Sequence, residues 1–242
     1  MALLEVACFS LESATLASTA GADRIELCAN REAGGTTPPL EWLDVIKQTV
    51  AVPVYVMIRP RGGSFYYSED EIEHMKHDIA AFKGLADGFV FGLLTVERRI
   101  DVFRTADLVT AASPLPCTFH KAFDEAVDAF EAFEDVIATG CQCLLTSGGA
   151  SSAHAGIDTI AQLVRMCQGR ITVMPGGGIR ASNIGAVRAF TRASILHSSA
   201  VPHGEDRPSA EEIRRMKATL NVEGAQMPLH IGPPASEAGH SP

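Results

Sequence analysis

The feature that most constrains this chain is an eightfold repeat of a short apolar run that ends in polar or glycine-rich residues. A helical pattern follows most of these runs. Strands that alternate with helices at this spacing form a parallel sheet, and eight such units are the number that closes into a barrel. The sequence therefore predicts a (β/α)8 barrel of the TIM type with the ends of all runs gathered at one mouth. The runs cover residues 3–8, 24–30, 52–63, 88–95, 117–124, 142–149, 170–178 and 194–199.

Helical spacing and capping residues support the alternation. Ser68 with Glu71, and Ser209 with Glu212, have the spacing of capping boxes at helix starts. The expected helices cover residues 10–20, 41–49, 68–82, 101–112, 128–139, 157–167, 183–190 and 209–220. Residues 221–242 are rich in Gly, Pro and Ser and show no period, so we expect one barrel domain over residues 1–220 and a disordered tail.

Composition excludes several classes of protein. The 242 residues suit one barrel, and the 46% of hydrophobic residues suffices for a large core. No apolar run approaches the ~20 residues of a membrane span, and the first residues do not read as a secretory signal, so we expect a cytoplasmic protein with reduced cysteines. The net charge of -9 and the lack of basic runs argue against nucleic-acid binding.

Alternation of side chains along each strand predicts which polar residues face the barrel lumen. The polar residues and the cysteine that it turns inward are Glu5, Glu26, Cys28, Arg59, Arg61, Thr118, His120, Thr146, His197 and Ser199. Among them, Glu5, Glu26 and His120 can transfer protons, with Asp124 as an orienting partner for His120. One interpretation makes these residues catalytic acids and bases. The other makes Glu5 and Glu26 a buried ion-pair network with Arg59 that fixes strand register.

Two groups of residues are candidates for binding an anionic substrate. Arg59 and Arg61 follow the third run and have the side chain that pairs with carboxylate or phosphate, although they could instead only neutralise the buried glutamates. The glycine triplet after the seventh run lies where barrels of this type commonly bind phosphate. Residues of the sixth and eighth runs add polar donors, and the second group is therefore Gly176, Gly177, Gly178, Thr146, Ser147, His197 and Ser198. Lys121 has the wrong parity for the lumen, which argues against a Schiff base there.

The cysteines raise the separate question of a metal. Cys8 and Cys28 lie at the tips of adjacent predicted strands, and thiolates select soft ions such as Cu(I). Parity, however, turns Cys8 outward when Glu5 points inward.

With these motifs in hand, the chain resembles the CutC family. The motifs are GADRIELCAN at 21–30, GGTTP at 34–38, VMIRPRGG at 56–63, FHKAFD at 119–124, LTSGG at 145–149, MPGGGIR at 174–180 and HSSA at 197–200. The resemblance implies a TIM-type barrel, a cytoplasmic homo-oligomer, and a part in copper homeostasis with Cu(I) bound through cysteines, here Cys28 and Cys8.

Two functions follow as expectations. The first is copper homeostasis with Cu(I) as the bound ion. The alternative is a lyase or isomerase that acts on a small anionic metabolite, with or without a phosphate group, at the mouth of the barrel. A lumen of Glu, Arg, His and Thr favours the second, because Cu(I) prefers thiolates and few charges.

Overall fold

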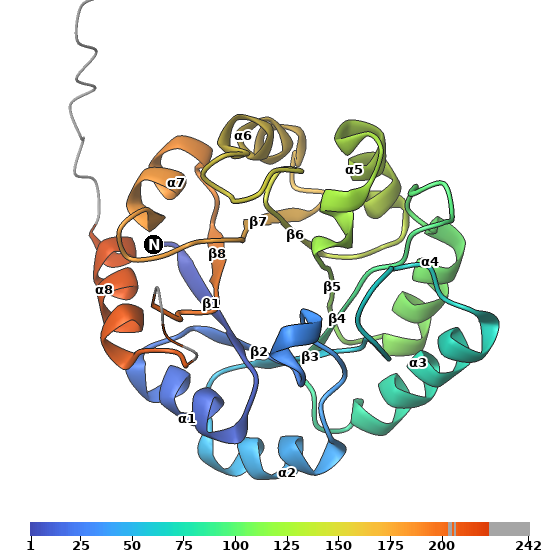
Figure 1. The fold of residues 1–242 in the computed structure, drawn as a ribbon, viewed down its shortest axis with the longest axis horizontal. Helices are drawn as coiled ribbons and strands as arrows, with labels where there is room; N and C mark the ends of the chain where they lie inside the picture. Colours follow the sequence, from blue (N-terminus) through green and yellow to red (C-terminus); the bar gives the residue numbers. More distant parts are fainter. Residues whose placement is uncertain (203–204, 206, 223–242) are drawn as a thin grey trace, which may run out of the picture.

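A computed structural model describes residues 1–202, 205 and 207–222 of the chain as a single ring of strands surrounded by helices (Figure 1). The predicted (β/α)8 barrel is confirmed, and every strand lies within one of the eight apolar runs. The strands are β1 (Leu3–Cys8), β2 (Arg24–Leu27), β3 (Val54–Met57), β4 (Gly88–Phe91), β5 (Cys117–Phe119), β6 (Cys143–Thr146), β7 (Thr172–Pro175) and β8 (Ile195–Ser198).

The helices cover the outside of this ring (Figure 1). The two predicted capping serines are confirmed, since the Ser68 and Ser209 side chains accept from the backbone N–H of Glu71 and Glu212. The helices are α1 (Leu11–Ala20), α2 (Leu40–Thr49), α3 (Glu69–Phe82), α4 (Val102–Ala112), α5 (Ala129–Ala138), α6 (Ile157–Met166), α7 (Ile184–Thr191) and α8 (Ala210–Asn221), with short 3-10 helices η1 (Arg31–Ala33) and η2 (Lys121–Glu125). Most of the predicted tail, residues 223–242, lies outside the described residues.

The sheet is parallel throughout, in the order β7-β6-β5-β4-β3-β2-β1-β8. Within the described part of the chain, β7 and β8 share no ladder pairing, although they lie next to each other in the ring (Figure 1). The Ser198 hydroxyl crosses this seam by donating to the carbonyl of Ile179 at 2.7 Å. The barrel is thus closed by side chains at one of its strand junctions.

Two apolar regions hold the strands in place. The larger one lies between strands and helices, and its long runs of fully buried aliphatic and aromatic side chains explain why the strands read as continuous apolar segments. Smaller clusters fill the lumen, such as Cys143 and Leu145 with Met174 and Ile195. Since Leu145 faces the lumen and Leu144 belongs to the outer core, the inward direction predicted for Thr146 is wrong.

Loops cover part of the mouth above β2 and β3. The turn that carries η1 projects toward the centre of the ring in Figure 1, as the blue coil near the labels β2 and β3. A side chain at Gly35 in this loop would meet Cys28 Sγ at 3.5 Å and Met57 Cε at 3.7 Å. The loop therefore lies directly on the lumen residues of these two strands.

Candidate functional site

The strand register brings one acid, one base and one arginine together inside the barrel. Glu5 on β1 is in register with Arg24 on β2 and with His197 on β8. Its carboxylate accepts from Arg24 Nε and lies 2.7 Å from His197 Nδ1. Glu5 is fully buried, so these two partners replace the water that its charge would otherwise need.

A second acid completes the group. Glu26 is buried on β2, and its Oε2 lies 4.0 Å from His197 Nε2 and accepts from Cys28 Sγ at 3.4 Å. Its other oxygen, Oε1, is buried and has no hydrogen-bond partner in the described part of the chain. One ligand atom each of Glu5, Glu26 and His197 lies within 4.8 Å of the other two, which is the geometry of a potential metal site. We call these three residues the lumen triad.

Burial and neighbouring charges set the protonation of the lumen triad. Burial would raise the pKa of Glu5, but the Arg24 charge and the bond to His197 hold it below its usual value. Burial raises the pKa of Glu26. Burial opposes a charge on His197, yet Glu26 and Glu5 raise its pKa above the ordinary one. The triad therefore holds an ionised Glu5 beside two groups that retain protons more readily than usual.

The predicted pair of metal-binding cysteines does not form. Cys8 packs in the outer core and its Sγ lies 3.4 Å from the carbonyl of Ser13 on α1. Cys28 instead packs in the lumen against Met57 and Val90. Burial raises the pKa of both thiols, which disfavours the thiolate that Cu(I) requires. Of the two, Cys28 alone lies beside the triad, because successive side chains of a strand point to opposite faces.

His120 lies in the lumen as predicted, but Asp124 does not orient it. His120 Nδ1 accepts from the N–H of Ala122 at 3.2 Å, which leaves the ring proton on Nε2. Nε2 is buried, and none of the described residues accepts from it. Burial first, and the charge of Arg59 second, lower the His120 pKa to about 3. Asp124 accepts instead from Thr146 Oγ1, Ser147 and Gly149. His120 is thus a neutral imidazole.

The two predicted anion-binding arginines serve loop structure. Arg59 donates to the carbonyls of Ala33, Gly35 and Gly63, and not to Glu5 or Glu26. Arg61 pairs with Glu71 at the start of α3 and donates to the carbonyl of Tyr66. Most N–H groups of both guanidinium groups donate to acceptors within the protein, so few remain to bind a substrate.

The predicted polar donors at β6 and β8 are also partly engaged. Thr146 and Ser147 bind Asp124, and Ser198 closes the seam between β7 and β8. Gly177 and Gly178 differ from these residues, because within the described chain their N–H groups donate to no acceptor. Both have left-handed backbone with φ near 98° and 72°, a conformation that favours glycine.

Sequence reasoning missed Arg24 and set Lys121 aside on its parity. Arg24 opens β2 with the same parity as Glu26, and that parity could have identified it as the partner of Glu5. Lys121 follows β5 in η2, where strand parity no longer applies, and a side chain at Gly177 would approach Lys121 Nζ to 3.3 Å. Lys121 therefore reaches the mouth beside the glycine triplet, contrary to its predicted direction.

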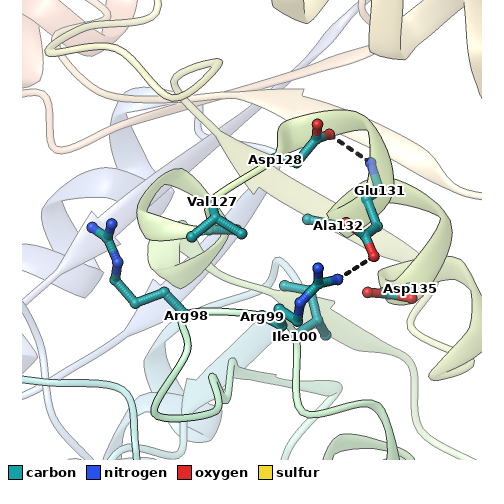
Figure 2. A pocket seen from close by; sticks show the side chains of 9 residues that line it. Arg98, Arg99, Ile100, Val127, Asp128, Glu131, Ala132 and Asp135 are labelled. Atoms are coloured by element: carbon teal, nitrogen blue, oxygen red, sulfur yellow. Dashed lines mark hydrogen bonds and ion pairs between the residues drawn. The ribbon is translucent and has the colours of Figure 1, made fainter.

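A surface hollow at the start of α5 is not a second site. Figure 2 shows Arg99 paired with Glu131 there and Asp128 accepting from the backbone of α5. Its volume of about 10 Å³ is far below that of a ligand pocket. The described helices also include none that is long and apolar enough to span a membrane.

The fold and the buried triad define a TIM-barrel protein with a polar lumen. Residues 2–202 match the model of the CutC family, and the chain belongs to that family. Relatives include the copper homeostasis protein cutC homolog of Homo sapiens, 48% identical over 82% of this chain and 73% of that protein. A family protein CutC of Xylella fastidiosa is 46% identical over 81% of this chain and 74% of that protein.

Solved structures agree with this assignment. A CutC protein of Streptococcus agalactiae, named for copper homeostasis, superimposes with a TM-score of 0.78 and 33% identity over 82% of this chain and 99% of that one. The thiamine phosphate pyrophosphorylase of Pyrococcus furiosus gives a TM-score of 0.62 at 16% identity, over 90% and 95% of the two chains. The second likeness concerns the fold alone.

Proposed function

We propose that this protein takes part in copper homeostasis by holding a copper ion on Glu5, Glu26 and His197 in the barrel lumen. The observation that carries the proposal is the convergence of these three buried ligand atoms within 4.8 Å. The choice of copper rests on the names of the relatives, and the choice of binding site rests on the lumen triad.

The donor set fits a divalent ion better than Cu(I). Imidazole and carboxylate suit Cu(II) and Zn(II), whereas Cu(I) prefers thiolates. Glu26 Oε1 is buried and finds no hydrogen-bond partner among residues 1–202, 205 and 207–222, so a cation would satisfy this oxygen. Arg24 opposes binding through its charge, and metal would have to compete with it for Glu5. Cys28 is the thiol that a Cu(I) ion at this place would use.

Metal titration of matched variants tests the proposal. We expect Cu(II) and Zn(II) to bind the native protein at one ion per chain and to lose about tenfold or more in affinity in Glu26→Gln and in His197→Gln. Glutamine imitates the protonated form of Glu26, which burial favours, so the first variant should fold. Binding would be measured by competition with a chelator, for Cu(I) in the absence of oxygen.

Two controls complete this experiment. Glu41→Gln changes an exposed carboxyl on α2 and should leave affinity unchanged. Cys28→Ser should keep the affinity of the protein for divalent ions and abolish tight Cu(I) binding. Equal affinity of Glu26→Gln, His197→Gln and the native protein for every ion would refute the lumen site.

A second candidate function rests on Lys121. Its amine lies 3.6 Å from Asp124 Oδ2 and beside Gly177, and the N–H groups of Gly177 and Gly178 donate to no acceptor among the described residues. An ammonium group next to free N–H groups at the mouth of a TIM barrel is suited to a phosphate or carboxylate. This arrangement supports a lyase or isomerase that acts on a small anionic metabolite.

Phosphate binding separates the second candidate from the first. We expect inorganic phosphate to bind the native protein and to bind Lys121→Met about tenfold more weakly, as followed by phosphorus NMR. Lys76→Met removes an amine on α3 that pairs with Glu73 and is the matched control. Equal binding by all three proteins would exclude Lys121 as the residue that holds the phosphate.

The cytoplasmic location and the homo-oligomeric state of the protein stay predictions.

A further inference from the structure

A cavity opens at the end of the barrel opposite the mouth. Its volume is about 490 Å³, within the range of small-molecule sites. Residues near the starts of β1 to β3 and of β5 to β8 line it, including Leu3, Arg24, Tyr55, Cys143, Ser194 and Ile195. We call this space the basal cavity. The lumen triad lies deeper in the barrel, and Arg24 belongs to both regions.

Arg24 is the charged side chain that lines the basal cavity. Its side chain is 14% exposed, and its guanidinium carbon lies 4.2 Å from the centre of the Tyr55 ring. Nε donates to Glu5, but the hydrogen bond from Nη2 goes to Met174 Sδ at 3.4 Å. A thioether is a weak acceptor. Nη2 of this buried cation is therefore only weakly satisfied.

The lining of the basal cavity selects the kind of ligand. None of the lining residues in the described part of the chain is acidic, so the lining offers an anion the guanidinium of Arg24 and no repelling carboxylate, while Glu5 shares the Arg24 charge from the lumen side. Leu3 and Ile195 give apolar walls, and Tyr55 adds an aromatic one. An inorganic anion would leave these walls unused, whereas an organic carboxylate matches both the walls and the planar fork of the guanidinium.

We propose that the basal cavity binds a small organic carboxylate, with the carboxylate on Arg24 and the apolar part against Tyr55, Leu3 and Ile195. This site is separate from the mouth and its test needs no metal, although Arg24 connects it to the lumen triad through Glu5. Arg24 would then share its donors between Glu5 and the ligand, as the five N–H groups of a guanidinium allow.

Benzoate is a suitable probe, because it joins a carboxylate to a flat apolar ring. It would be titrated into the metal-free full chain by calorimetry and by ligand-observed NMR, with benzamide as the uncharged comparison. We expect saturable binding of benzoate and at least about tenfold weaker binding of benzamide.

Two variants locate the binding. Ser194→Trp places a large side chain at the exposed rim of the cavity without touching Arg24 and should abolish binding. Arg24→Lys keeps a positive charge for Glu5 but loses the planar fork, and should weaken binding about tenfold. Gln48→Trp on the exposed face of α2 is the control and should bind normally.

Three results would each overturn the proposal. They are absence of saturable benzoate binding, equal binding of benzoate and benzamide, and unchanged binding in a folded Ser194→Trp variant. Ser194→Trp decides the case even where Arg24→Lys fails to fold. Since the experiment contains no metal, its failure would leave the copper proposal standing, and failure of the metal titration would leave this one standing.

Discussion

Buried charged and polar residues of this barrel obtain their partners from neighbouring strands or from loops above them. The sequence indicated correctly that Glu5, Glu26 and His120 face the lumen, because the alternation of side chains is a local property. It failed to predict their partners. Glu5 pairs with Arg24 and His197, which are 19 and 192 residues away, and Arg59 turns to loop carbonyls instead.

The neutral state of His120 predicts a pH-dependent stability. Its pKa in the folded protein is lowered to about 3, whereas an imidazole in an unfolded chain titrates near ~6.5. At a pH between these two pKa values, the imidazole is protonated in the unfolded chain and neutral in the folded protein. The stability from neutral His120 is thus fully present above pH ~6.5 and is lost as the pH falls, by up to about 1.4 kcal/mol per pH unit.

Urea unfolding of His120→Asn tests this effect. Asparagine can keep an acceptor for the N–H of Ala122 but does not titrate. We expect the variant to be less stable than the native protein at pH 7 and the difference to shrink toward pH 4.5. His154→Asn, at an exposed position, is the control. A difference that stays constant over this range would contradict a buried neutral His120.

At the scale of elements, short-range signals set the helices and long-range contacts set the loops. The caps of α3 and α8 each join a serine to a glutamate three positions later, so the sequence alone is enough to predict them. The direction of Lys121 does not follow from a local pattern, because η2 breaks the strand before it. Asp124, at the other end of η2, binds the loop after β6 and fixes η2 in place.

Removal of the Asp124 carboxylate should therefore destabilise the fold. It accepts from Thr146 Oγ1, from the N–H and Oγ of Ser147, and from the N–H of Gly149. Asp124→Ala leaves these donors without their acceptor, and we expect a loss of about 2–4 kcal/mol in the free energy of unfolding. Chemical denaturation measures it. Asp158→Ala, on the exposed first turn of α6, should show no loss, and equal effects of both variants would count against this role of Asp124.

At the scale of the whole molecule, the ring is not equally strong at every junction. Within the described residues β1 is hydrogen-bonded to strands on both sides, while β7 and β8 each have a ladder on one side. Ser198 bridges the remaining junction through the carbonyl of Ile179. The barrel should consequently open first between β7 and β8.

Native-state hydrogen exchange tests this order of opening. We expect backbone amides of β7 and β8 to exchange about tenfold faster than those of β1 and β2, because local opening at the seam breaks fewer hydrogen bonds. Ser198→Ala should increase this difference in exchange rate, because it removes the hydrogen bond from Ser198 to the carbonyl of Ile179. Uniform protection around the ring would show that packing of α7 and α8 compensates for the missing ladder.

The sequence by itself determined the barrel, the positions of its strands and helices, and the inward direction of Glu5, Glu26, Cys28 and His120. These properties depend on hydrophobic period and capping, which act over a few residues. Only the tertiary structure decided that His197 joins the two glutamates and that Arg24 lines a basal cavity. The reason is physical: contacts across a closed barrel join residues far apart in the chain, and the length and direction of each side chain select among several possible partners.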